Sequence, residues 1–169
     1  MAYKNKTFVS FDGDTDMQYY RLMLAWKQND NMPFNFYNAH DINTSRDSSM
    51  EASIKAQLAE RMRNSKVFVI LVGESTRYLY KFVRWEIEQA ISRNMPIIVV
   101  NLNGTRFMDS DRCPPILRGA LAVHVSFNAK IVEAFKKSLG NLEKNDWIDA
   151  FTIAERLRFG RLPKTCPVD

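Results

Sequence analysis

Short runs of β-branched and aromatic residues alternate along the chain with segments whose apolar residues recur at helical spacing. A run that is apolar at every position is typical of a strand covered on both faces of a parallel sheet. Residues 66–73 and 96–102 contain runs of this kind, so we expect them to be the central strands. Residues 7–11, 34–37 and 122–127 are shorter runs of the same kind and predict three further strands.

The connecting segments predict amphipathic helices, because their apolar residues recur every three or four positions. These helices are expected at residues 16–28, 48–62, 80–93 and 131–139. The buried face of the first is expected to consist of Tyr19, Leu22, Met23 and Trp26. The buried face of the third is centred on Val83 and continues through Ile87, Ala90 and Ile91. Strands that alternate with helices predict a doubly wound α/β domain, in which helices cover both faces of a mostly parallel sheet.

Right-handed crossover connections restrict the order of the five strands, and the flavodoxin-like order 2-1-3-4-5 is predicted. In such sheets ligands bind beyond the carboxyl ends of the strands, near the switch between the first and third strands. That rule selects the loops at residues 11–16, 38–47 and 73–82 as the expected ligand site. We expect one domain over residues 1–140 and a C-terminal helical extension over 141–169 that packs on or beside it.

Composition restricts the class of protein. With 46% hydrophobic and 25% charged residues, the chain has the balance of a globular domain. No apolar run reaches the roughly 18 residues that span a membrane, and the N-terminus lacks the pattern of a signal peptide. The two cysteines and two histidines show no metal-ligand spacing, so we expect no metal and a reducing, cytoplasmic setting. The net charge of +5 is dispersed, so neither a nucleic-acid nor a membrane partner is expected.

Acidic residues follow the first predicted strand at Asp12, Asp14 and Asp16. A response-regulator receiver also has acidic residues there, but it needs an aspartate directly after the third strand, where this chain has Gly73-Glu74-Ser75. The alternative is an acidic turn before a helix, because the helix macrodipole stabilises negative charge at its N-terminus. The usual phosphate-binding and acyl-transfer motifs are absent from the chain.

The third predicted helix carries the most informative carboxylate, Glu86. It lies about 60° from the centre of the buried face and one turn from the aromatic ring of Phe82. A carboxylate beside the core, near the expected crevice, can hold a sugar hydroxyl or stabilise a developing cation. A solvated glutamate that pairs with a lysine or arginine is the alternative that the pattern leaves open.

Three segments together resemble the TIR-like domain family, most closely the ThsB proteins of bacterial Thoeris anti-phage defence. Phe8-Val9-Ser10-Phe11 resembles the first strand of the family, which ends in Ser-Phe/Tyr before acidic residues. Residues 67–75, VFVILVGES, resemble the third strand and its loop. Residues 82–87, FVRWEI, resemble the segment W-C/V-x-x-E-I/L, with Phe82 in place of the usual tryptophan. The resemblance covers about residues 5–140.

The resemblance implies an enzyme that cleaves the nicotinamide–ribose bond of NAD⁺ and makes a linear or cyclic ADP-ribose signal for a separate effector protein. Glu86 falls at the position of the family's catalytic glutamate. The implied substrate-binding residues are Ser10, Phe11, Asp12, Asp41, Asn43, Ser45 and Phe82. Three of them, Asp41, Asn43 and Ser45, lie in a loop that covers the site in TIR domains and mediates self-association. NAD⁺ is implied as the substrate, and no cofactor is implied.

Two other functions remain open. A non-catalytic TIR adaptor would act through homotypic contacts, although such adaptors usually lack the glutamate. A nucleoside deoxyribosyltransferase-like enzyme shares the open sheet and uses a nucleophilic glutamate. It would carry further acidic residues after the fourth strand, where Asp109 and Asp111 lie.

Overall fold

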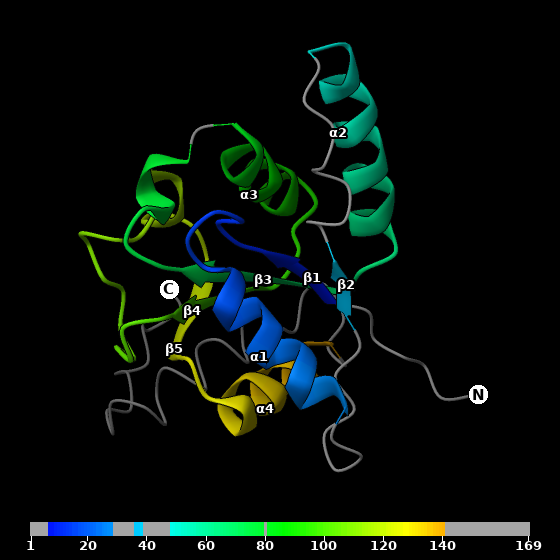
Figure 1. Cartoon of the computed structure of the whole chain (residues 1–169). Coiled ribbons are helices and arrows are strands. Elements are labelled where there is room, and N and C mark those ends of the chain that lie inside the picture. The colour runs from blue at the N-terminus through cyan, green and yellow to red at the C-terminus, as the bar shows by residue number, and fades with distance from the viewer. Residues whose placement is uncertain (1–6, 29–35, 39–47, 80, 141–169) are drawn as a thin grey trace, which may run out of the picture.

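The centre of the protein is one parallel sheet of five strands, shown in the computed structural model of Figure 1. The structure describes residues 7–28, 36–38, 48–79 and 81–140. The strands are β1 (Thr7–Ser10), β2 (Phe36–Asn38), β3 (Val67–Val72), β4 (Ile97–Asn101) and β5 (Ala122–Ser126). They lie in the order β2-β1-β3-β4-β5, which is the order predicted from the sequence, and every neighbouring pair is parallel.

Helices cover both faces of the sheet, as predicted (Figure 1). In this view α2 and α3 lie above the sheet, while α1 and α4 lie below it. The helices are α1 (Met17–Gln28), α2 (Ser48–Arg63), α3 (Phe82–Ser92) and α4 (Ala129–Gly140). Two short 3-10 turns, η2 (Thr76–Tyr78) and η3 (Pro115–Leu117), lie in the loops that follow β3 and β4.

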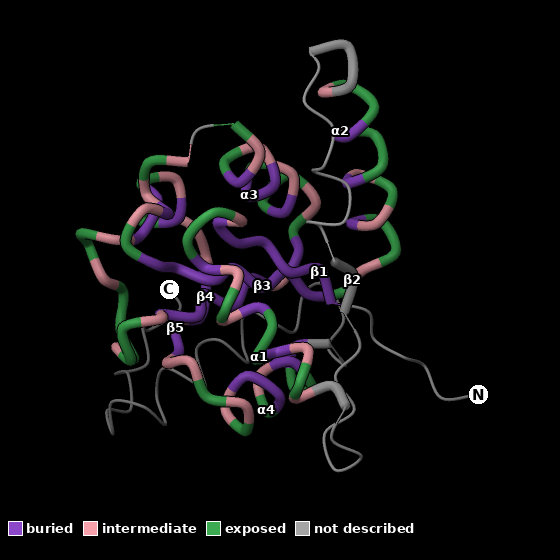
Figure 2. The backbone as a smooth tube through the Cα atoms, viewed as in Figure 1, coloured by how far each residue is buried: buried purple, intermediate pink, exposed green. Residues whose placement is uncertain are grey.

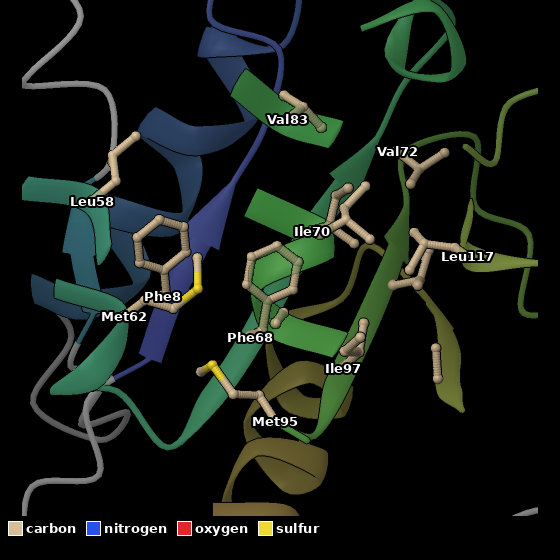
Figure 3. Close-up of a cluster of buried hydrophobic side chains, with 14 of the residues drawn as sticks. Phe8, Leu58, Met62, Phe68, Ile70, Val72, Val83, Met95, Ile97 and Leu117 are labelled. Atoms are coloured by element: carbon tan, nitrogen blue, oxygen red, sulfur yellow. The ribbon is translucent and has the colours of Figure 1, made fainter. Parts of the chain in front are cut away.

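The core is divided into two layers by the sheet, because successive side chains of a strand point to opposite faces. Every residue of β1, β3 and β4 is buried, which Figure 2 shows as continuous purple strands. On the α2 and α3 side, Phe8 stacks on Phe68 with ring centroids 5.7 Å apart. Figure 3 shows Leu58 and Met62 of α2 beside Phe8. Full burial of one such side chain contributes about 1.5–3 kcal/mol.

The buried face of α1 is rotated from the face that its apolar spacing predicts. Leu22, which we expect to be buried, is 50% exposed, whereas Tyr20 and Met23 are almost fully buried. Trp26 belongs to the packed layer as predicted, since its ring lies 4.6 Å from that of Phe127. The prediction for Leu22 is wrong because helical spacing defines a stripe of residues, but not which edge of the stripe meets the sheet.

The buried face of α3 contains a carboxylate in place of an expected apolar residue. Ile91, which we expect in this face, is 36% exposed. Glu86 is 4% exposed, and it lies among Val83, Ile87 and Ala90 on the buried side of the helix. Glu86, which is predicted on the flank of the helix, therefore faces the sheet. This inward orientation of Glu86 is what forms the candidate active site.

Some predictions lie outside the described residues. They include the helical extension over 141–169 and the loop residues Asp41, Asn43 and Ser45. Within the described ranges, no helix is both long enough and apolar enough to cross a membrane.

Candidate active site

Ser10 and Glu86, which are 76 residues apart in sequence, meet at the carboxyl end of β1. Ser10 is the last residue of β1, and strand alternation turns it to the same face as Phe8, toward α3. The Ser10 hydroxyl donates a hydrogen bond of 2.5 Å to Glu86 Oε2. Both side chains are shielded from water, with 1% of Ser10 and 4% of Glu86 exposed. A strand and a helix thus hold one carboxylate in a defined orientation.

Burial raises the pKa of the Glu86 carboxyl to about 7, because a buried site solvates the ionised form poorly. The hydrogen bond from Ser10 favours the ionised form and acts in the opposite direction. At neutral pH both protonation states of Glu86 are therefore populated. A titratable group that changes state near neutral pH is a recognised mark of a functional site.

A second polar cluster joins the loops that follow β1 and β3, and Asp12 is its centre. Asp12 Oδ2 accepts a hydrogen bond of 2.6 Å from the Ser75 hydroxyl, and its Oδ1 accepts one of 3.0 Å from the N–H of Asp14. Thr15 Oγ1 lies 3.0 Å from Ser75 Oγ. Burial alone would raise the pKa of Asp12, but these hydrogen bonds outweigh it and hold the pKa below its usual value. Asp12 is therefore an ionised anchor between the two loops.

The Asp16 carboxyl fills the space beside Gly73 where any other residue would have its Cβ. A Cβ on Gly73 would lie 2.5 Å from Asp16 Oδ2 and 2.7 Å from its Cγ. The N–H of Gly73 donates a hydrogen bond of 2.8 Å to Thr76 Oγ1. Burial, followed by the neighbouring charge of Asp12, raises the pKa of Asp16 to about 6. The loops after β1 and β3 are close here only because Gly73 has no side chain.

The loop after β4 lies beside the loop after β3, at the carboxyl edge of the sheet. Asn101, at the end of β4, donates from Nδ2 to the carbonyls of Thr105 at 2.9 Å and Phe107 at 2.8 Å. Asp109 Oδ1 accepts from the N–H groups of Asp111 at 2.9 Å and Arg112 at 3.2 Å. These bonds, led by the one from Asp111, lower the pKa of Asp109. Asp109, one of the two aspartates that the deoxyribosyltransferase hypothesis invokes, is therefore engaged in holding its own loop.

The structure brings Ser10 and Glu86 together, as the resemblance implies, but it separates Phe11 from them. Phe11 lies on the opposite face of the sheet and stacks on Tyr20 of α1, with ring centroids 4.5 Å apart. It does not line a pocket beside Glu86, because one step along the strand reverses the direction of the side chain.

The remaining predicted site residues have three different placements. Asp12 lies in the loop directly beyond β1, in the cluster with Ser75. Phe82 begins α3 and is partly buried against the core layer that contains Val83 and Ile87. Asp41, Asn43 and Ser45 lie outside the described residues, so their assignment stays a prediction.

Several residues of this edge are missing from the sequence-based prediction. They are Thr15, Gly73, Ser75, Thr76 and Arg112. The expectation that ligands bind beyond the carboxyl ends of the strands selects the loop over 73–82 as a whole. A glycine directly after a buried strand indicates that another segment packs closely against the backbone there. Asp16 is part of the predicted acidic loop, but its contact with Gly73 joins segments distant in sequence and has no local signal. In the described part of the chain, no group of three or more His, Cys, Asp or Glu side chains could hold a metal ion.

Comparison with known proteins finds one matching family. Residues 8–106, more than half of the chain, match the model of the TIR-like domain of the Thoeris protein ThsB. No curated protein matches the chain. A crystal structure of a conserved protein from Enterococcus faecalis V583 is 17% identical, and the match covers 89% of this chain and 98% of that one. The TM-score of this match is 0.44.

Replacing Gly73 with alanine is expected to lower the free energy of unfolding by about 1–3 kcal/mol, because the new Cβ forces the Asp16 carboxyl out of its place. Urea denaturation measures this change. Gly119→Ala is the matched control, since nothing lies within 4 Å of a Cβ there. The cost of Gly73→Ala should shrink in an Asp16→Ala background. An equal cost in both backgrounds would contradict the contact.

Replacing Glu86 with glutamine is expected to stabilise the protein more at high pH than at low pH. The folded-state pKa of about 7 exceeds the ordinary 4.5, so the folded state binds more protons between these values. The contribution of Glu86 to stability is complete at low pH and is lost as the pH rises toward 7. Above pH 7, Glu86→Gln should therefore exceed the wild type by up to about 3 kcal/mol in unfolding free energy.

Urea denaturation at about pH 5 and about pH 8 provides the measurement. Glu88→Gln is the control for a general charge effect, because Glu88 lies on the same helix with its side chain 44% exposed. A difference between wild type and Glu86→Gln that is the same at both pH values would show that Glu86 is not shifted.

Proposed function

The chain belongs to the ThsB family of TIR-like domains, and we propose that it cleaves the nicotinamide–ribose bond of NAD⁺ with Glu86 as the catalytic carboxylate. The observation that carries this proposal is the buried Ser10–Glu86 pair. It lies at the carboxyl end of β1, next to β3, where sheets of this order bind their ligands. The family supplies the link to anti-phage defence, since ThsB is a Thoeris protein.

The proposed reaction suits a single carboxylate. The C1′–N bond of the nicotinamide ribose breaks, and its electron pair moves to the ring nitrogen, so nicotinamide leaves as a neutral molecule. Positive charge develops on C1′ and the ribose ring oxygen, as in the oxocarbenium-like transition states of glycosidases. Because the leaving group needs no proton, the step requires no general acid. What it requires is a negative charge beside the ribose.

Glu86 meets this requirement through its burial and its partner. Little water surrounds the carboxylate, so it interacts with a developing cation more strongly than an exposed carboxylate would. Ser10 donates a hydrogen bond to it, and a ribose hydroxyl offers the same kind of donor. Substrate entry must uncover Glu86, which is only 4% exposed. Ser10, Asp12 and Phe82 are the described residues that we propose for the pocket.

The second half of the reaction determines the product. Attack of water on C1′ with loss of a proton gives ADP-ribose, and attack by a nitrogen of the adenine ring gives a cyclic product. We propose that either product acts as a signal for a separate effector protein, and that self-association through TIR surfaces accompanies activity. NAD⁺ is the substrate in this scheme, and the scheme uses no metal and no cofactor.

The test is incubation of the full-length protein with NAD⁺, followed by chromatography of the products. Wild type and Glu88→Gln should release nicotinamide, and Glu86→Gln should be at least about 100-fold slower, because it cannot become negatively charged. Glu88 is a matched control on the same helix, where it pairs with Arg84 at 3.0 Å on the exposed side.

The same three proteins should also be compared in phage-infected cells, because an enzyme that needs an infection signal is active only there. Release of nicotinamide by Glu86→Gln at the wild-type rate would contradict the catalytic assignment. No release by any of the three proteins, in either setting, would favour the adaptor function instead.

A further inference from the structure

Arg112 is a cation at the edge of the sheet where β1 and β3 end. Its Nη2 lies 3.3 Å from Glu74 Oε1, and Glu74 is the second residue after β3. Its charge also reaches Asp16 in the loop after β1, where it lowers the pKa against the larger effects of burial and Asp12. The guanidinium therefore contacts the loop after β3 and acts electrostatically on the loop after β1, the two loops that ligands meet in a sheet of this order.

The backbone on either side of Arg112 is held in place by hydrogen bonds. The N–H of Arg112 donates to Asp109 Oδ1 at 3.2 Å, and the N–H of Cys113 donates to the Asp109 carbonyl at 2.9 Å. Arg77 of η2 donates from Nη1 to the Asp111 carbonyl at 2.8 Å. Figure 1 shows η2 and the loop after β4 at the same edge of the sheet. The loop presents Arg112 from a fixed position, which reduces the entropy that a ligand must overcome.

The contacts of the guanidinium itself are easily exchanged. Its partner Glu74 has a side chain that is 87% exposed, and the other carboxylate, Asp109, lies 4.0 Å from Nε. Exposed ion pairs contribute only about 0–1 kcal/mol. Arg112 keeps 28% of its side chain accessible. A ligand that offers the guanidinium better contacts can therefore take the place of Glu74 at little cost.

A diphosphate is a ligand of this kind. The planar guanidinium fork binds phosphate oxygens through two parallel hydrogen bonds, which are stronger than neutral ones. Asp12, Asp16 and Glu74 make this edge of the sheet acidic, so a diphosphate that binds here needs a compensating cation. Two nearby arginines are already engaged with carbonyls, Arg77 with that of Asp111 and Arg118 with that of Ser110.

We infer that Arg112 binds the diphosphate of the dinucleotide substrate, and that Glu74 is the resident partner which the diphosphate displaces. This inference rests on the proposed function for the identity of the nucleotide. It assigns Arg112 to substrate recognition and gives it no part in breaking the glycosidic bond, which belongs to Glu86.

Two substitutions with opposite expected effects test the inference. Calorimetric titration of the full-length protein with ADP-ribose should show binding weakened about tenfold or more by Arg112→Gln, which removes the charged donor. Glu74→Gln removes the competing carboxylate and should strengthen binding about two- to fivefold. Arg84→Gln, which removes an exposed arginine paired with Glu88 on α3, should leave the affinity unchanged. If the Arg112–Glu74 pair were only structural, both of its substitutions would weaken binding.

A pair of substrates separates diphosphate recognition from catalysis. NAD⁺ and nicotinamide riboside contain the same scissile bond, but the riboside has no diphosphate. Arg112→Gln should raise the KM for NAD⁺ about tenfold with little change in kcat, and should leave cleavage of the riboside unchanged. Arg112→Lys, which keeps the charge and loses the fork, should fall between wild type and Arg112→Gln.

Failure of this inference and failure of the proposed function give different results. Absence of ADP-ribose binding to the wild type, or binding that Arg112→Gln does not weaken, would overturn the role of Arg112. An equal loss of activity on NAD⁺ and on the riboside would also overturn it. Binding of ADP-ribose that depends on Arg112, without any release of nicotinamide from NAD⁺, would support the inference while refuting the proposed catalysis.

Discussion

The hydrogen bond from Ser10 to Glu86 ties the first strand of the sheet to a helix 76 residues further along the chain. Its geometry requires β1 to end at Ser10 with the correct alternation of side chains, and α3 to turn Glu86 inward. The parallel register aligns Ser10 with Ile70 of β3, so the loops that follow β1 and β3 leave the sheet side by side. The contacts between these loops, from Asp12 to Ser75 and from Asp16 to Gly73, follow from that alignment.

The site is costly in stability, and the core around it offsets the cost. Burial raises the pKa of Glu86 to about 7 and that of Asp16 to about 6, so both are destabilising when ionised. The residues of β3 and β4 are all buried, and this mostly apolar burial offsets the cost of the buried carboxylates. A carboxylate that is solvated by protein groups instead of water is poised to stabilise charge on a substrate. Stability and function therefore make opposite demands on Glu86.

Much of the fold follows from the sequence, because the signals that carry it are local. Two apolar runs predict the central strands, and the flavodoxin-like order predicted for a doubly wound sheet with right-handed crossovers is the one observed. The helix faces are predicted less well, as the exposed Leu22 and Ile91 show. The spacing of apolar residues defines a stripe along a helix, but the packing of all the helices on the sheet decides which side of that stripe is buried.

The site is only partly predictable for the same reason. Glu86 can be found from its position in the third helix together with the family resemblance, yet its depth of burial and its bond to Ser10 depend on how α3 meets β1. Phe11 is expected to line the pocket but stacks on Tyr20 in the other layer, because a resemblance between segments does not convey the direction of each side chain. The fit of Asp16 against Gly73 and the position of Arg112 over Glu74 join segments far apart in sequence, and no local pattern encodes them.

The state of the Glu86 carboxyl is the quantity on which this account depends most directly. A carbon-13 NMR titration of the glutamate side-chain carboxyls, with Glu86→Gln to assign the resonance, measures its pKa in the folded protein. We expect a value of about 7 in the wild type. Ser10→Ala should give a higher value, because it removes the hydrogen bond that favours the ionised form. A pKa near the ordinary 4.5 that Ser10→Ala leaves unchanged would contradict the account.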